Sequence, residues 1–177
     1  MKKALSIFLL IIMFFIVYFL QANFFTWFTI AGIMPNLYVI LVLFIGLFAK
    51  KRQGLILGLL FGLYIDIVLG RTVGVSAIAL ATIGMLGEIF SKNFSKDSRI
   101  TIMLMVIGTT AFFEVFSYIS HTLINRTNFE ILSFLRILLI ELLFNSLITI
   151  IIYPIIKKTG YKLEEIFEDK ISLTRYF

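Results

Sequence analysis

Four acidic residues, Asp66, Glu88, Glu114 and Glu141, interrupt long apolar stretches of the sequence. A carboxylate inside a membrane-spanning helix is costly, so it normally faces a bundle interior or a cavity and has a polar partner. At a rise of 1.5 Å per residue, Asp66 and Glu114 lie roughly 18 and 21 Å along their predicted helices, and Glu141 lies roughly 10 Å along a helix that runs the opposite way. In an apolar core of about 30 Å, these three carboxylates are predicted to lie at a similar depth.

Two arginines lie close to these acids in the sequence. Arg71 follows Asp66 by five residues, and Arg136 precedes Glu141 by five. We therefore predict an intramembrane polar cluster of Asp66, Glu114, Glu141, Arg71 and Arg136. Two interpretations stay open at this point. Either the cluster only fixes how the helices pack, or it binds a partner helix, a lipid head group or a small molecule.

These residues do not form a recognisable catalytic or metal-binding pattern. Asp66 has no acidic neighbour in the sequence, and His121 is the only histidine in a chain that has no cysteine. Neither a G-x-S-x-G nor a G-x-x-x-x-G-K-[ST] string occurs, which argues against a serine-hydrolase elbow and a phosphate-binding loop. We predict no enzyme activity, no catalytic residue, no metal site and no cofactor, and an interfacial or polar-cluster position for His121.

The composition indicates that a membrane surrounds the elements that position these side chains. Of the 177 residues, 60% are hydrophobic and 15% are charged, and the mean hydropathy is +1.06, whereas a soluble domain is about 45–50% apolar. Six spans of roughly 20 residues leave only about 57 residues for loops and tails, too few for a separate soluble domain. We predict an all-α, polytopic membrane protein with a six-helix domain at residues 1–157 and a short cytoplasmic tail at residues 158–177.

Charged residues bound the predicted spans. Residues 4–49 carry no charge and are too many for one span, so they are predicted to form two helices with both charged ends on the same side. The six helices are expected at residues 4–20, 35–49, 54–69, 73–90, 100–123 and 134–156. In this arrangement 13 of the 16 Lys and Arg residues lie on the side of both termini, which the positive-inside rule places in the cytoplasm. Topology explains the net charge of +6, and no nucleic-acid partner is needed.

Small residues recur along the third and fourth predicted helices. They are Gly54, Gly58 and Gly62 in the third helix, Gly70 just after it, and Gly74, Ala77, Ala81 and Gly84 in the fourth. In lipid, small residues at four-residue spacing let helix backbones approach closely, so this series predicts a tightly packed helical hairpin with Asp66 on the glycine face. A helix opened for contact with a substrate is the alternative. Glu88 is expected to pair with Lys92, one turn further on.

Motifs between residues 35 and 74 resemble those of the rod shape-determining protein MreD family. They are Pro35-Asn36 at the start of the second helix, the basic run Lys50-Lys51-Arg52, the motif G-x-x-x-G-L-x-x-D at Gly58, Gly62, Leu63 and Asp66, and the following Gly70 and Gly74. The resemblance covers the whole chain in hydropathy. It implies a fold similar to the substrate-binding S components of energy-coupling-factor transporters, and it carries over no catalytic residues.

The resemblance also implies membership of the bacterial cell-elongation machinery, which synthesises lateral peptidoglycan, in the cytoplasmic membrane. The expected partners are the bitopic protein MreC, the RodA glycosyltransferase with its class B penicillin-binding protein, MreB filaments and membrane lipid. The principal hypothesis is a scaffold that acts through its helix faces, its tail at residues 162–176 and an apolar strip within residues 122–135. The alternatives are a small-molecule-binding membrane subunit of a transporter, like an S component, and a lipid-handling protein.

Overall fold

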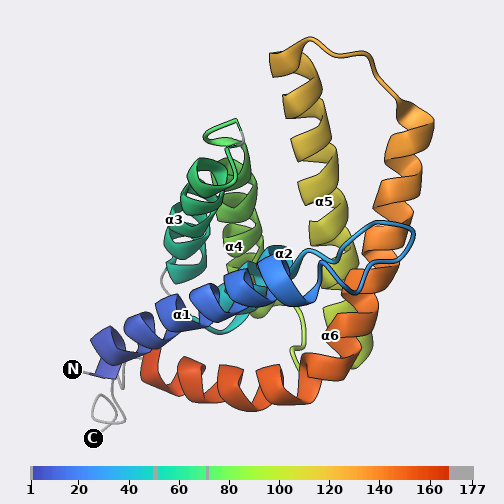
Figure 1. Ribbon diagram of the computed structural model, residues 1–177. Helices are drawn as coiled ribbons and strands as arrows, with labels where there is room; N and C mark the ends of the chain where they lie inside the picture. Colours follow the sequence, from blue (N-terminus) through green and yellow to red (C-terminus); the bar gives the residue numbers. More distant parts are fainter. Residues whose placement is uncertain (1, 50–51, 71, 168–177) are drawn as a thin grey trace, which may run out of the picture.

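The computed structural model describes residues 2–49, 52–70 and 72–167, and helices make up most of these ranges. Figure 1 shows α2 at the centre of the bundle, with α3 and α4 on one side and α5 and α6 on the other. The helices are α1 (Lys2–Phe19), which the π-helical turn η1 (Leu20–Phe24) extends, α2 (Leu37–Phe48), α3 (Gln53–Val68), α4 (Val75–Asn93), α5 (Arg99–Asn125) and α6 (Ile131–Phe167). The predicted all-α fold is confirmed.

Four helical segments are long and apolar enough to cross a membrane, and they agree with four of the six predicted spans. They are Ser6–Phe24, Val75–Asn93, Arg99–Asn125 and Ile131–Ile166. The other two predicted spans correspond to α2 and α3, which are apolar but shorter. The chain is therefore a multi-pass membrane protein. The expected similarity to transporter S components stays a prediction.

The central helix α2 has 12 residues, all of them buried. At 1.5 Å per residue it is only about 18 Å long, well short of an apolar core of about 30 Å. A helix that is apolar on every side is buried among other elements. Since neighbouring helices surround α2 completely, its ends lie within the protein and need polar partners there.

Glycines bring α3, α4 and α2 into backbone contact. A Cβ atom built on Gly62 would lie 2.5 Å from the Cα of Ala77 in α4, and one built on Gly54 would lie 2.6 Å from the Cα of Gly46 in α2. A Cβ on Gly58 would overlap the carbonyl oxygen of Leu80. The glycine face of α3 therefore has no room for a side chain where it meets α2 and α4. This explains the four-residue spacing of Gly54, Gly58 and Gly62.

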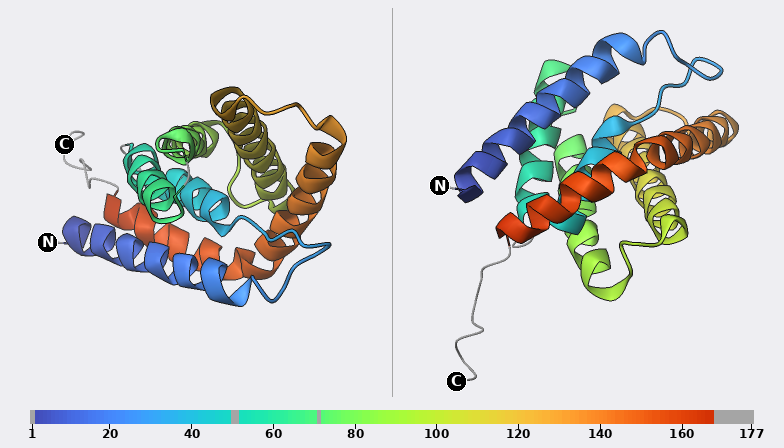
Figure 2. Two further views of the ribbon diagram at one scale, coloured as in Figure 1. Left: turned by 45° about the horizontal axis from the view of Figure 1, so that its top comes forward. Right: turned by 90° about the horizontal axis from the view of Figure 1, so that it is seen from below.

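Helix α6 continues past Ile156, where the sixth span was predicted to end, to Phe167. It contains Pro154, which lacks an N–H and whose ring displaces the preceding turn. Figures 1 and 2 show α6 bending, so that its last part crosses one end of the bundle. The break predicted at Lys157 is thus a bend in a continuous helix. The rest of the predicted tail, residues 168–177, lies outside the described residues.

Polar contacts attach this last part of α6 to the turn between α4 and α5. Lys96 Nζ lies 2.9 Å from Glu164 Oε1, and Lys157 Nζ lies 2.6 Å from Asp97 Oδ1. The Tyr161 hydroxyl donates a hydrogen bond of 3.1 Å to Asp97. The hydrogen bond from Lys157 is the main reason why the pKa of the Asp97 carboxyl is lowered from its usual range. The end of α6 is therefore part of the folded bundle.

Candidate functional site

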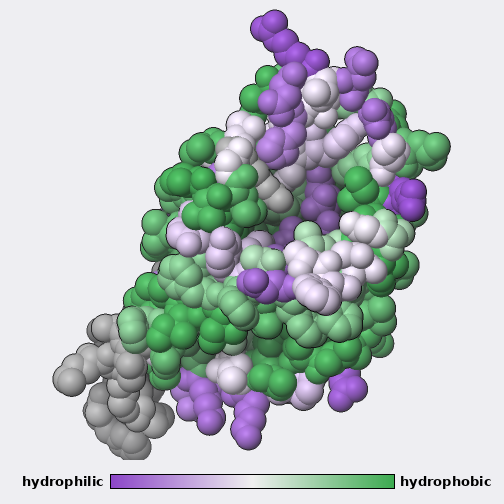
Figure 3. All heavy atoms as spheres, viewed as in Figure 1, coloured by the Kyte–Doolittle hydropathy of each residue, from purple (hydrophilic) through white to green (hydrophobic). Residues whose placement is uncertain are grey.

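A cavity of about 880 Å³ lies at the end of the bundle where α3 and α5 finish and α4 and α6 begin. In Figure 3 the surface is largely hydrophobic over its middle, and hydrophilic residues lie deep in a hollow. The polar residues that line the cavity include Gln21, Asn36, Ser76, Glu114, Ser117 and Glu141. The cavity therefore gathers side chains from all six α-helices at this end, the open end of the bundle.

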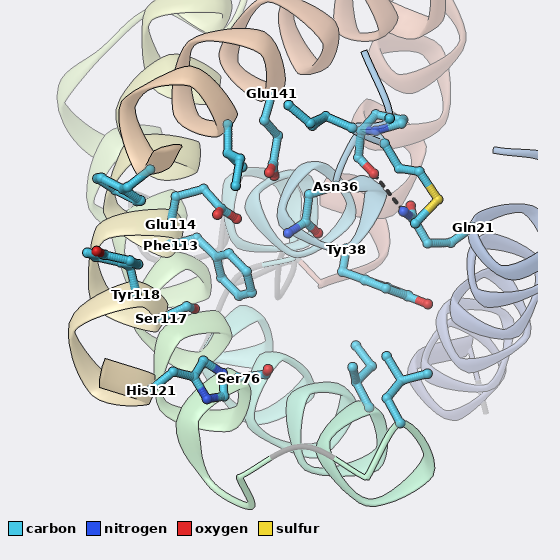
Figure 4. Close-up of a pocket in the computed structure, with 18 of the residues that line it drawn as sticks. Gln21, Asn36, Tyr38, Ser76, Phe113, Glu114, Ser117, Tyr118, His121 and Glu141 are labelled. Atoms are coloured by element: carbon cyan, nitrogen blue, oxygen red, sulfur yellow. Dashed lines mark hydrogen bonds between the residues drawn. The ribbon is translucent and has the colours of Figure 1, made fainter. Parts of the chain in front are cut away.

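Glu114 and Glu141 are the two predicted cluster members that line the cavity. They come from α5 and α6, and Figure 4 shows both carboxylates pointing toward the same part of the cavity, near Asn36. Glu141 is only 6% exposed. Ser117 lies one turn after Glu114, and its buried Oγ has no hydrogen-bond partner among the described residues. The structure thus brings two acids and a hydroxyl together in a cavity that is open on one side.

The start of α2 forms the floor of the cavity, and side chains from η1 and α6 hold it in place. Gln21 donates a 2.6 Å hydrogen bond to the carbonyl oxygen of Pro35 (Figure 4) and accepts one of 3.1 Å from the N–H of Leu37. The N–H of Asn36 donates to Asn145 Oδ1 at 2.8 Å. The first N–H groups of a helix have no hydrogen-bond partner within the helix. At a protein surface water accepts their hydrogen bonds, whereas here the side chains of Gln21 and Asn145 accept them.

Asn36 is the N-cap of α2, and its side chain accepts a hydrogen bond from the N–H of Val39. Pro35 therefore precedes the cap and is not the first helical residue, which corrects the predicted start of the helix by two positions. Asn145 is fully buried and also donates to Thr110 Oγ1 at 3.0 Å. The Pro35-Asn36 motif thus has a structural explanation: it ends the loop and caps a helix that begins inside the protein.

Asp66 lies apart from the two cavity acids and caps a different helix. Its carboxylate accepts hydrogen bonds from the N–H groups of Gly74 at 2.8 Å, Ser76 at 3.1 Å and Ala77 at 3.4 Å, at the start of α4. The side chain is fully buried. A carboxylate at a helix N-terminus satisfies unpaired N–H groups and interacts favourably with the helix dipole. Asp66 therefore joins the end of α3 to the start of α4.

The other predicted site residues that the structure describes do not line the cavity. Arg136 is exposed and does not line it, and Arg71 lies outside the described residues. Gly70 and Gly74 have φ angles of +61° and +102° and open space where a Cβ would be, so they serve the turn between α3 and α4 by their conformation. Lys92 pairs with Glu88 at 2.9 Å, as expected from their spacing.

Two contacts fix the rim of the cavity. His121 Nδ1 lies 3.4 Å from Thr72 Oγ1, which links α5 to the turn before α4. The Tyr118 hydroxyl accepts a 2.6 Å hydrogen bond from the N–H of Glu130, and its ring stacks on Phe134 with centroids 4.3 Å apart. The rim is therefore built from α5, the turn between α3 and α4, and the connection between α5 and α6.

Gln21 and Ser76, which line the cavity, were not predicted from the sequence. Their polar side chains recur within otherwise apolar helices, and this was an available signal. Within the described ranges, no three His, Cys, Asp or Glu side chains come close enough to hold a metal ion together. The site is thus a polar cavity lined by three acids, Glu114, Glu130 and Glu141, with an ordered rim.

The family of the chain follows from comparison with known proteins. No curated protein matches the chain, and no solved structure does. The family model described as rod shape-determining protein MreD matches residues 1–161 of the 177. This match includes all the motifs noted above and every residue of the cavity, and the chain therefore belongs to the MreD family.

Proposed function

We propose that this protein is a non-enzymatic scaffold of the bacterial cell-elongation machinery. Family membership supports a rod-shape-determining membrane protein, and the match over residues 1–161 is the observation that carries the proposal. The scaffold binds an MreC-like bitopic protein and a RodA-like glycosyltransferase with its class B penicillin-binding protein, and it connects them to MreB-like filaments. It lies in the cytoplasmic membrane with both termini in the cytoplasm.

The distribution of apolar surface supports a mechanism based on helix contacts. Large apolar side chains are exposed along α1, including Phe8, Phe15 and Phe19, which are 47–65% exposed. Lipid covers such faces, and a partner's membrane helix can replace it through packing contacts. Apart from the connection at residues 25–36, the connections between the described helices have at most six residues, so they offer little surface for binding.

A second surface for partners lies at the start of α6. Phe129, Ile131, Leu132 and Leu135 are 45–85% exposed and form the apolar strip predicted near the outer side. In the proposed orientation this strip lies at the outer membrane–water interface. There it can receive the segment of an MreC-like protein that leaves the membrane.

Depletion followed by microscopy tests the proposed function. Rod-shaped cells are expected to become round and wide, and a tagged copy of the protein is expected to co-purify the MreC-like partner. Leu132→Ser should weaken this co-purification, whereas Leu143→Ser, which changes an exposed leucine in the middle of α6, should not. Normal rods after depletion would overturn the scaffold role. Equal recovery with both variants would overturn the assignment of the strip.

A further inference from the structure

We propose that a groove between α5 and α6, at the end of the bundle opposite the open end, binds an anionic phospholipid. The groove is formed by three residues at the start of α5 and three in the middle of α6, which are Arg99, Ile102, Met103, Thr149, Ile150 and Tyr153. The inference goes beyond the scaffold role, because it assigns a ligand to a specific place on the bundle.

Two basic side chains from different helices lie at one end of this groove. The guanidinium carbon of Arg99 is 5.8 Å from the centroid of the Tyr153 ring, and Lys157 Nζ is 6.0 Å from the same centroid. Lys157 also pairs with Asp97. Arg99 is exposed and forms no ion pair with any residue that the structure describes. Arg99 is therefore the positive charge that is available to a ligand here.

The charge of the surrounding surface also favours an anion. The described residues 95–99 and 150–165 carry five basic side chains and three acidic ones. Two of the three acids are held in the ion pairs with Lys96 and Lys157. A phosphate group matches the excess of positive charge, because arginine and lysine donate charge-assisted hydrogen bonds to its oxygens.

The walls and the flanks of the groove suit acyl chains. Ile102 and Thr149 form its base and are each only 1% exposed. Apolar side chains beside the groove are 53–72% exposed, and they are Ile100, Leu104, Leu147 and Ile151. Arg99 lies one turn before Met103, at the end of α5. A head group at Arg99 therefore places its chains along the apolar part of the two helices.

An anionic phospholipid matches both halves of this site. A soluble phosphate would use only the basic groups. A zwitterionic phospholipid has the same chains, but it carries a positive charge beside its phosphate. Basic pockets between membrane-spanning helices bind anionic head groups on the cytoplasmic side, and the proposed orientation places this end of the bundle there.

Fluorescence quenching by brominated lipids measures which lipid lies beside the groove. The full-length protein carries Leu147→Trp as the reporter, because Leu147 is exposed and precedes Ile150 by three residues. Trp27→Phe removes the only tryptophan of the natural chain. The protein is reconstituted in phosphatidylcholine vesicles in which brominated phosphatidylglycerol or brominated phosphatidylcholine replaces part of the lipid. Phosphatidylglycerol is expected to bind about fivefold more strongly, the contribution of one basic residue near a membrane surface.

Matched variants locate the site. Arg99→Gln should remove most of the preference for phosphatidylglycerol, because it removes the basic group that has no ion pair. Arg99→Lys keeps the charge and should retain the preference. Lys92→Gln removes one positive charge from the same end of the bundle, on α4 and outside the groove, and should behave like the wild type. Since Arg99 and Lys92 are both exposed, all three variants are expected to fold.

The outcomes separate this proposal from the scaffold role. Equal quenching by the two brominated lipids would overturn the lipid site and would leave Arg99 to an acidic segment of a protein partner. An unchanged preference in Arg99→Gln would overturn it too. So would an equal loss in Arg99→Gln and Lys92→Gln, because the overall charge of this end would then explain the preference. The cell-shape result of depletion depends on none of these measurements, so either proposal can fail while the other stands.

Discussion

Asp66 and Glu141 are both buried acids, yet their surroundings differ. Asp66 accepts hydrogen bonds from three N–H groups at the start of α4, whereas Glu141 lines the cavity. Depth along a helix could be estimated from the sequence, but depth does not say which way a side chain points. The glycine spacing did carry that information: Asp66 follows Gly58 and Gly62 at four-residue intervals, so it faces α4 as they do.

The cap formed by Asp66 predicts a loss of stability when its charge is removed. Asp66→Asn should lower the free energy of unfolding by about 1–2 kcal/mol, because an amide oxygen replaces a carboxylate that accepts three hydrogen bonds. Thermal unfolding in detergent, followed by circular dichroism, measures the change. Glu88→Gln is the control, since its pair with the exposed Lys92 contributes only about 0–1 kcal/mol. A Tm for Asp66→Asn equal to that of the wild type would show that the cap does not stabilise the hairpin.

At the scale of elements, the sequence predicted the number and order of the helices because charged residues mark their ends. The start and end predicted for the second helix, residues 35–49, lie within two residues of α2 (Leu37–Phe48). What hydropathy could not show is that α2 is buried on all sides, because a lipid-facing helix and a protein-embedded helix are equally apolar. The continuation of α6 was also missed. Lys157 was interpreted as the end of a helix because it is charged, whereas it lies within α6 and pairs with Asp97.

Close packing of α3 against α4 predicts opposite effects for two glycine substitutions. Gly62→Ala should destabilise the protein by about 1–3 kcal/mol, because the new Cβ would lie 2.5 Å from the Cα of Ala77 and backbone must move. Gly108→Ala in α5 has no atom within 4 Å of the new Cβ. It should be neutral or should stabilise the helix by up to about 1 kcal/mol, since Ala has the higher helix propensity. Unfolding midpoints of the two variants measure the difference, and equal midpoints would contradict the packing argument.

At the scale of the whole molecule, the two ends of the bundle differ in structure: one is closed by ion pairs and the other contains the cavity. One end carries the attachment of α6 to the turn that contains Lys96 and Asp97, and the other is the open end with the cavity. The proposed orientation places the first end in the cytoplasm, because most Lys and Arg residues lie there. In this orientation the cavity opens toward the outside of the membrane.

Cysteine labelling tests this orientation, because the chain contains no cysteine of its own. Asn128→Cys places a single thiol at an exposed residue of the open end, and Ser95→Cys places one at an exposed residue of the opposite end. In intact cells without an outer-membrane barrier, a membrane-impermeant maleimide should label Asn128→Cys at once and Ser95→Cys only after permeabilisation. Labelling of both variants after denaturation controls for expression. The reverse pattern would place the cavity on the cytoplasmic side and would overturn the proposed orientation.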